Sequence, residues 1–253
     1  MLAEQRHCEI LSCLVGSGGA RVTALAQALC VTHETIRRDL RKLEGEGKLI
    51  RIHGGAIPIR EEQRDLPFEV RKTARLEAKR AIATRALREV AEGDVVALDA
   101  SSTAHELARV LPDMPLTVVT NSVPVSVTLM ACSHIRVVST GGILEVGSRS
   151  YVGSLAEDAL QRLNVNKLFL SSKGIDPRRG LSETTDEQAR LKRRMMDVAE
   201  KVFLLADHSK FGVRSVVFFA DTSEADVVIT DAEANATAVA AVRETGPVVE
   251  MAG

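Results

Sequence analysis

The chain places polar residues after five short apolar runs, and their types suit a ligand with phosphate and hydroxyl groups. Three successive hydroxyls ahead of a helix would add to its free N–H groups and the positive end of its dipole, which together bind anions. A lysine can neutralise a phosphate, and carboxylate or amide groups can hydrogen-bond sugar hydroxyls. The candidate effector-binding residues are Asp99, Ser101, Ser102, Thr103, Asn121, Gly141, Gly142, Lys173 and Lys210.

Other interpretations of these residues stay open. The Ser and Thr residues could serve only as helix caps. A nucleotide is a weaker alternative ligand, because the chain has neither a G-x-G-x-x-G nor a Walker A string. His208 could touch a ligand or stay clear of it, and the histidines at positions 7, 105 and 134 are expected on helix surfaces or in loops. The four cysteines form no C-x-x-C pair, so we expect no metal and no cofactor.

A second candidate site lies near the N-terminus, on one face of a helix that Thr32 can cap and that extends to about Glu46. Apolar residues recur there at helical spacing and predict the buried face: Ile36, Leu40 and Leu43. The opposite face suits insertion into a DNA major groove. It carries His33, Thr35, Arg37, Arg38 and Arg41. We expect Arg38 and Thr35 to read bases and Arg37 and Arg41 to contact phosphates, whereas a merely solvated helix face is the alternative.

The elements around this helix indicate a winged helix-turn-helix. A helix over residues 3–16 and a short helix from Val22 precede it, and the string KLIRIHGGAIPI follows it. The alternating apolar residues of that string predict a β-hairpin, with Gly54 and Gly55 as its turn. Arg51 and His53 would lie on this wing, beside the DNA backbone or the minor groove. We therefore assign residues 1–58 to a DNA-binding domain and the charged stretch 59–72, which contains Pro67, to a linker.

Residues 73–253 are predicted to form an α/β effector domain that begins with a helix over 73–92. Strands are expected at 95–99, 116–120, 135–139, 167–171, 201–206 and 226–230, with helices at 103–111, 122–131, 153–163 and 184–199. Apolar strands that alternate with helices are typical of a parallel sheet covered on both faces. An open Rossmann-like sheet is favoured over a (β/α)₈ barrel, because about 180 residues are too few for a barrel. In open sheets of this kind, ligands bind beyond the carboxyl ends of the strands.

Composition fits a cytoplasmic protein that meets DNA through its N-terminal part. Residues 1–60 carry nine Lys or Arg against six Asp or Glu, whereas the rest carries 24 against 28. This uneven charge favours contact of the N-terminal part with a polyanion. The chain has no apolar stretch of transmembrane length and no apolar signal core at its N-terminus.

The string VTHETIRRDLRKLEGEGKLIRIHGGA resembles the N-terminal signature of the DeoR family of bacterial transcriptional regulators. The DASST loop, the VVTNS segment, STGG and LADHSKFG are similar to the C-terminal sensor domain of the same family. The resemblance implies operator DNA binding, a sensor that resembles ribose-5-phosphate isomerase in fold, and a phosphorylated sugar as effector. It also implies that Ser101, Ser102 and Thr103 hold the phosphate with help from Lys210. Ser101 replaces a glycine common in the family, and its Cβ is expected to narrow the approach of the phosphate.

We therefore expect a DNA-binding transcriptional regulator, a repressor of a sugar catabolism operon, that forms a homo-oligomer and is controlled by a phosphorylated sugar. One alternative is a sugar-phosphate isomerase with an added DNA-binding part. In that case Asp99 would be the base and Lys173 would stabilise an enediolate. Another alternative, an architectural DNA protein, leaves the polar strand ends unexplained. We expect no catalytic residue and no membrane partner.

Overall fold

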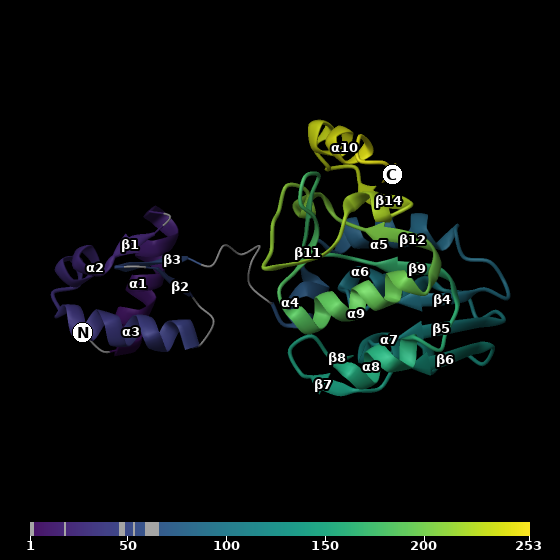
Figure 1. The fold of residues 1–253 in the computed structure, drawn as a ribbon, viewed down its shortest axis with the longest axis horizontal. Coiled ribbons are helices and arrows are strands. Elements are labelled where there is room, and N and C mark those ends of the chain that lie inside the picture. The colour runs from purple at the N-terminus through teal and green to yellow at the C-terminus, as the bar shows by residue number, and fades with distance from the viewer. Residues whose placement is uncertain (1–2, 18, 46–48, 53, 59–65) are drawn as a thin grey trace. The chain divides into compact units, whose positions relative to one another are not determined.

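The structure, a computed structural model, describes residues 3–17, 19–45, 49–52, 54–58 and 66–253. The chain divides into two compact units, residues 1–64 and 65–253 (Figure 1). The smaller unit has one hydrophobic core and the larger unit has two. His53, which we expect on the wing, lies outside the described residues.

The N-terminal unit is a winged helix-turn-helix, as predicted. Its elements are α1 (Ala3–Ser17), β1 (Ala20–Arg21), α2 (Val22–Ala28), α3 (His33–Gly45), β2 (Leu49–Ile52) and β3 (Gly55–Pro58). The Oγ1 of Thr32 accepts a hydrogen bond from the Thr35 N–H at 3.2 Å, so this residue caps α3. The three predicted core residues of α3, Ile36, Leu40 and Leu43, are at most 1% exposed.

The wing differs from the prediction at one glycine. Gly54 has φ +83°, a conformation that glycine adopts without steric cost. Gly55 was expected in the turn, but it belongs to β3 and pairs with Ile52 of β2 and Arg21 of β1. A Cβ at position 55 would lie 2.3 Å from the carbonyl oxygen of Ala20. Gly55 is therefore required by the close approach of β1 and not by the turn.

A short helix lies in the stretch that the sequence assigns to a linker. α4 (Phe68–Thr73) begins after Pro67, whose extended backbone suits a helix start. Phe68 is 1% exposed, and its ring lies edge-on to His105 with centroids 5.5 Å apart. The Phe68 N–H also donates to the carbonyl oxygen of Gly147 at 2.9 Å. α4 is thus packed as part of the C-terminal unit.

The C-terminal unit is built on a seven-stranded parallel sheet in its described residues, with strand order β15-β14-β12-β9-β4-β5-β6. All six predicted strands form, and a seventh was missed. The strands are β4 (Val95–Leu98), β5 (Leu116–Thr120), β6 (Ile135–Ser139), β9 (Val165–Leu170), β12 (Ala199–Leu205), β14 (Val227–Asp231) and β15 (Val248–Ala252). The chain order reverses direction between β4 and β9, which is the switch point where ligands bind in such sheets.

Helices cover both faces of this sheet, as expected for a Rossmann-like layer (Figure 1). Alternate residues of each strand enter two separate cores. α5 (Leu76–Leu87), α6 (Ser102–Val110) and α7 (Val123–Leu129) pack on one face. α8 (Ser154–Leu160), α9 (Asp186–Asp197) and α10 (Ala236–Arg243) pack on the other. α10, like β15, was not anticipated.

Smaller elements complete the C-terminal unit. β7 (Ile143–Glu145) and β8 (Ser150–Val152) form a hairpin, and β10 (Gly174–Asp176), β11 (Gly180–Glu183) and β13 (Val217–Ala220) form a three-stranded antiparallel sheet. Two short 3₁₀ helices, His208–Lys210 and Thr222–Glu224, follow β12 and β13. None of the helices that the structure describes is long and apolar enough to cross a membrane.

Candidate DNA-binding and effector sites

A buried ion pair fixes the orientation of α3 on α1. The Asp39 carboxylate, 4% exposed, accepts hydrogen bonds from Arg6 Nε at 2.6 Å and Nη2 at 3.2 Å. His7 Nε2 lies 3.2 Å from the Oδ1 of the same carboxylate. Burial alone would raise the pKa of Asp39, but the hydrogen bonds from Arg6 and His7 outweigh it and lower that pKa. The ionised carboxylate therefore holds the two helices together.

The opposite face of α3 is exposed and basic, as predicted. Arg37, Arg38, Arg41 and His33 are exposed, whereas Thr35 is half-buried and its Oγ1 lies 2.9 Å from the Thr32 Oγ1. Arg37 has an exposed partner in Glu34, with Nη1 and Oε2 3.6 Å apart. Exposed pairs of this kind contribute little to stability, so the Arg37 guanidinium can exchange partners at low cost.

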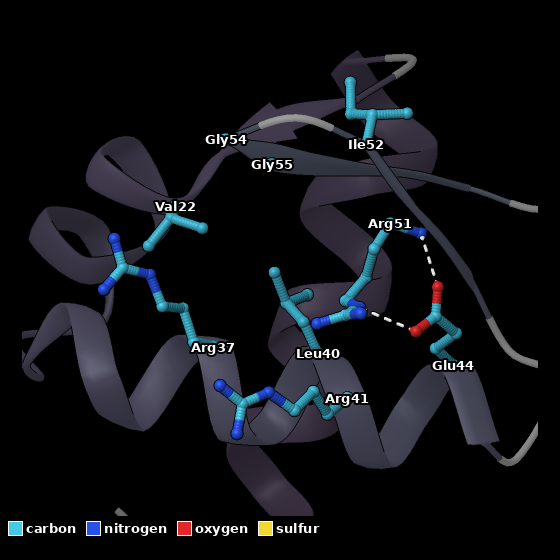
Figure 2. Close-up of a pocket in the computed structure, with 9 residues that line it drawn as sticks. All are labelled: Val22, Arg37, Leu40, Arg41, Glu44, Arg51, Ile52, Gly54 and Gly55. Atoms are coloured by element: carbon cyan, nitrogen blue, oxygen red, sulfur yellow. Dashed lines mark hydrogen bonds and ion pairs between the residues drawn. The ribbon is translucent and has the colours of Figure 1, made fainter.

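A hollow of about 530 Å³ separates α3 from the wing (Figure 2). Figure 2 shows Arg37 and Arg41 on the α3 side and Arg51 on the β2 side. The lining also includes Val22, Leu40, Glu44, Ile52, Gly54 and Gly55. Three of the predicted DNA-binding residues thus face one concave, positively charged surface.

Glu44 at the end of α3 holds the wing arginine in place. Its two carboxylate oxygens accept from the Arg51 N–H at 3.2 Å and from Arg51 Nε at 2.6 Å. The hydrogen bond from the Arg51 side chain is the main cause of a lowered pKa at Glu44. The wing is tied to the helices as well, because the Val22 N–H donates to the Gly54 carbonyl at 2.9 Å. The wing and α3 therefore present their arginines in a fixed relation.

The predicted effector residues all follow carboxyl ends of strands in the parallel sheet. Asp99 to Thr103 follow β4, Asn121 follows β5, Gly141 and Gly142 follow β6, Lys173 follows β9, and Lys210 follows β12. These five strands are adjacent in the sheet order, so the residues share one edge. The ends of β4 and β9 lie at its centre.

Asp99 at the centre of this edge is engaged by protein groups. Its Oδ1 accepts from the Ser101 N–H and its Oδ2 from the Ser171 N–H, both at 3.0 Å. Lys192 Nζ lies 2.9 Å from Asp99 Oδ2 and 2.7 Å from Glu183 Oε1, and it also donates to the Ser171 carbonyl. Asp99 is 1% exposed. The carboxylate therefore links the ends of β4 and β9 and is not placed to abstract a proton.

Ser101 caps α6, the helix that follows β4. Its Oγ accepts from the Ala104 N–H at 3.0 Å, and its φ of −76° is open to any residue. The expectation that the Ser101 Cβ narrows the approach of a phosphate stays a prediction. Ser102 and Thr103 form the first turn of α6 and are buried. The dipole of α6 places its positive end at this edge of the sheet.

Two buried polar atoms at this edge, on strand ends either side of β4, lack partners within the described part of the chain. They are the Oδ1 of Asn121, after β5, and the Oγ of Ser172, after β9. Asn121 is held by its Nδ2, which donates to the Tyr151 carbonyl at 3.0 Å. Gly141 and Gly142 turn the chain away from β6 with φ values of +62° and +115°. A buried acceptor and hydroxyl without partners leave polar groups that a ligand can satisfy.

Lys210 lies beside Asp207 at the end of β12. The Asp207 carboxylate, 2% exposed, accepts from the Ser209 N–H at 3.0 Å and so orders the turn that carries Lys210. Burial is the main cause of a lowered pKa at Lys210. His208 turns to Asp231 instead, with Nδ1 and Oδ2 2.8 Å apart. With Glu233 these two residues form a group whose possible metal-ligating atoms lie within 4.8 Å of one another, and His208 and Asp231 already contact each other.

Several structural partners escaped the sequence analysis. Asp39 shares the helical face of Ile36 and Leu43, and a charge on a buried face signals a buried partner. The expectation that His7 and His105 lie at the surface is wrong, since they are 9% and 5% exposed. Lys192 also lies on the buried face of α9, between Ala189 and Met196.

Comparisons with known proteins identify both units. A family model described as the DeoR-like helix-turn-helix domain matches residues 6–62, and one described as the DeoR C terminal sensor domain matches residues 74–232. The HTH-type transcriptional regulator YulB of Bacillus subtilis is 41% identical over 96% of this chain and 95% of its own. The L-fucose operon activator of Haemophilus influenzae is 40% identical over 88% of this chain and 89% of its own.

A solved structure of ribose 5-phosphate isomerase A from Methanocaldococcus jannaschii is 17% identical, with 56% of each chain covered and a TM-score of 0.41. The fold and the matches define a helix-turn-helix transcriptional regulator with a C-terminal sensor domain, and not an enzyme. The chain belongs to the DeoR family.

Proposed function

We propose that the chain is a cytoplasmic regulator of a sugar catabolism operon, that it acts as a repressor, and that a phosphorylated sugar controls its binding to operator DNA. The observation that carries the DNA part is the basic hollow between α3 and the wing. A major groove admits a helix of the size of α3, and the wing arginine would meet the adjacent backbone.

In this proposal α3 supplies both base and phosphate contacts. Arg38 and Thr35 read base edges from the outer face of the helix, together with His33. Arg37, Arg41 and Arg51 line the hollow and contact phosphates. His53 is proposed as a further contact on the wing. The Arg6–Asp39 pair supports this arrangement, because it fixes the angle at which α3 is presented.

The effector is proposed to bind at the carboxyl edge of the parallel sheet, with its phosphate at the start of α6. Ser102 and Thr103 would hold the phosphate through the first turn of the helix, and Ser101 would contribute as the cap. Asn121 would hydrogen-bond a sugar hydroxyl with its unpartnered Oδ1. Gly141, Gly142, Lys173 and Lys210 would complete the pocket. Since its carboxylate is already engaged, Asp99 would position these groups.

The regulator is proposed to act as a homo-oligomer. Helix-turn-helix proteins commonly bind paired half-sites, and a dimer supplies the matching pair of α3 helices. A ligand shifts such an assembly only through different affinities for its DNA-bound and free states. Repression is the part of this proposal that does not hold for every relative, since the relative from Haemophilus influenzae is named an activator.

A selection experiment followed by anisotropy titration tests the DNA part. Duplexes that the wild-type protein selects from a random 30-base-pair pool would serve as the probe. We expect Arg38→Ala to reduce affinity for the selected duplex at least fivefold and to relax its sequence preference, because one bidentate base contact contributes about 1–3 kcal/mol. Arg41→Ala should weaken selected and unselected duplexes alike and lower the salt dependence by about one phosphate contact.

Arg194→Ala is the matched control, because Arg194 is an exposed arginine of α9 in the C-terminal unit. An Arg38→Ala protein that binds selected DNA as tightly as this control would overturn the assignment. Addition of phosphorylated sugars to the complex then tests the effector part. Release of DNA by such a compound, but not by the unphosphorylated sugar, is expected of a repressor.

A further inference from the structure

The turn between α4 and α5 holds an arginine in a strained backbone conformation. Arg75 has φ 50° and ψ 43°, the left-handed region that non-glycine residues seldom adopt. Lys79, one turn into α5, fixes this geometry by donating to the carbonyl oxygens of Arg71 and Ala74. Strain of this kind persists where the surroundings impose it, and it often marks functional sites.

The strained turn directs Arg75 toward the carboxyl end of β12. Arg75 Nε lies 3.8 Å from Asp207 Oδ1, too far for a hydrogen bond, and its side chain is 49% exposed while that of Asp207 is 2% exposed. Asp207 already accepts from Ser209, and it precedes Lys210 by three residues. The turn thus brings a half-exposed guanidinium to the edge of the sheet that carries the proposed effector pocket.

Positive charge exceeds negative charge at this place. Asp207 is the carboxylate that raises the pKa of Lys79 and of Lys210 most strongly. The charges of Arg71 and Arg75 lower the pKa of both lysines. Glu183, which also acts on Lys210, is held by Lys192 at 2.7 Å. Burial and the neighbouring cations lower the pKa of Lys79 to about 8. An anion bound here would relieve the repulsion among four cations.

This cationic group is separate from the start of α6. α6 follows β4, whereas Lys210 follows β12, and β9 lies between those two strands. Two strand spacings amount to roughly 10 Å, which is comparable with the length of a five- or six-carbon chain. A ligand with an anionic group at each end can therefore reach both positions at once.

We propose that Arg75, Lys79 and Lys210 form a second anion-binding subsite, and that the effector is therefore a sugar with anionic groups at both ends. A sugar bisphosphate or a phosphorylated sugar acid has this chemistry. The inference rests on the proposed effector pocket, in which the start of α6 holds the first phosphate. The second anionic group would replace Asp207 as the partner of Arg75.

Two ligand pairs, in each of which only one member has an anionic group at the second end, test the subsite. They are fructose 1,6-bisphosphate against fructose 6-phosphate, and 6-phosphogluconate against glucose 6-phosphate, titrated calorimetrically into the full chain. At least one doubly anionic ligand should bind the wild type at least tenfold more tightly than its partner. Arg75→Asn should abolish that preference and leave the monophosphate within twofold, since asparagine tolerates the left-handed backbone.

Arg80→Gln is the matched control, because Arg80 lies on α5 with a side chain 50% exposed and has Glu77 and Glu106 as partners. It should change neither affinity by more than twofold. Equal affinities within both ligand pairs, with binding retained, would overturn the second subsite and leave the proposed function intact. An Arg75→Asn protein that keeps the full preference would do the same. If none of the four compounds binds, the effector part of the proposed function is lost together with this inference.

Discussion

Replacement of Asp39 by asparagine is the sharpest test of how the N-terminal unit holds α3. The change keeps the size of the side chain but removes the charge that Arg6 contacts at 2.6 Å. Arg6 and Asp39 are 8% and 4% exposed, so the guanidinium would stay buried without its counter-charge. Loss of one partner from a buried ion pair costs about 3–5 kcal/mol, and the lower value applies here because asparagine retains one acceptor oxygen.

A loss of about 3 kcal/mol is large for this unit, whose 64 residues correspond to a total stability of about 3–10 kcal/mol. Amide hydrogens in the protected core of α1 and α3 should therefore exchange about 100-fold faster, at a factor of ten for each 1.4 kcal/mol. Peptides from the sheet of the C-terminal unit should exchange at the wild-type rate. Operator binding should fall with the folded fraction of the N-terminal unit.

Glu34→Gln is the control, since it removes the same charge from α3 at a side chain that is 71% exposed. Exchange should change by about twofold at most, as expected of an exposed pair. The pKa of Asp39 is lowered on folding, so its contribution is complete above about pH 4 and is lost as the pH falls through the folded value. Equal exchange rates in the two variants at pH 7 would refute the view that this ion pair secures α3.

Three further predictions concern the wing, the cap of α6 and Lys79. Gly55→Ala should destabilise the N-terminal unit more than Gly54→Ala in hydrogen exchange, because its Cβ would meet the Ala20 carbonyl at 2.3 Å while position 54 has open space. Gly54→Ala should cost about 1 kcal/mol for its positive φ, and equal losses would contradict the pairing of β1 with β3. Ser101→Ala removes the cap on the Ala104 N–H, so the C-terminal unit should melt about 2–4 °C lower in calorimetry, and an unchanged melting temperature would contradict this role. Binding of fructose 1,6-bisphosphate should be accompanied by proton uptake at pH 8 but not at pH 6. Lys79 has a pKa of about 8 among Asp207, Lys210, Arg71 and Arg75, and a bound anion would restore its charge. Calorimetry in buffers of different ionisation enthalpy measures this uptake, and its absence at pH 8 would count against contact with Lys79.

The periodicity of apolar residues predicted most of the fold. Ile36, Leu40 and Leu43 marked α3 correctly, and the six central strands form where apolar β-branched runs stand. β15 was missed because Glu250 interrupts its apolar run, and only Val249 and Ala252 of this border strand are buried. α4 was missed because its charged residues conceal the one side chain, Phe68, that is buried.

The sequence predicted those candidate site residues whose chemistry follows from the type of residue and its place in a predicted helix or strand. The arginines of α3 and the hydroxyls after β4 needed only the helical period and the rule that ligands bind at strand ends. Asp99 looked the same in sequence as a ligand contact, and only the burial of Lys192 beside it shows that the carboxylate is engaged. Arg75 gave no sequence signal, because its importance depends on a left-handed backbone that asparagine or glycine more often adopts.

The packing of α4 on the C-terminal unit decides at which residue the chain can be divided into a DNA-binding fragment and a sensor fragment. The family model of the sensor begins at residue 74, whereas the buried ring of Phe68 packs on His105 and the carbonyls of Arg71 and Ala74 accept from Lys79. A fragment that starts at residue 74 would uncover the imidazole of His105 to water and deprive the Lys79 ammonium of one acceptor. A fragment that starts at residue 66 retains both, so autonomy of the sensor begins some eight residues earlier than homology alone would place it.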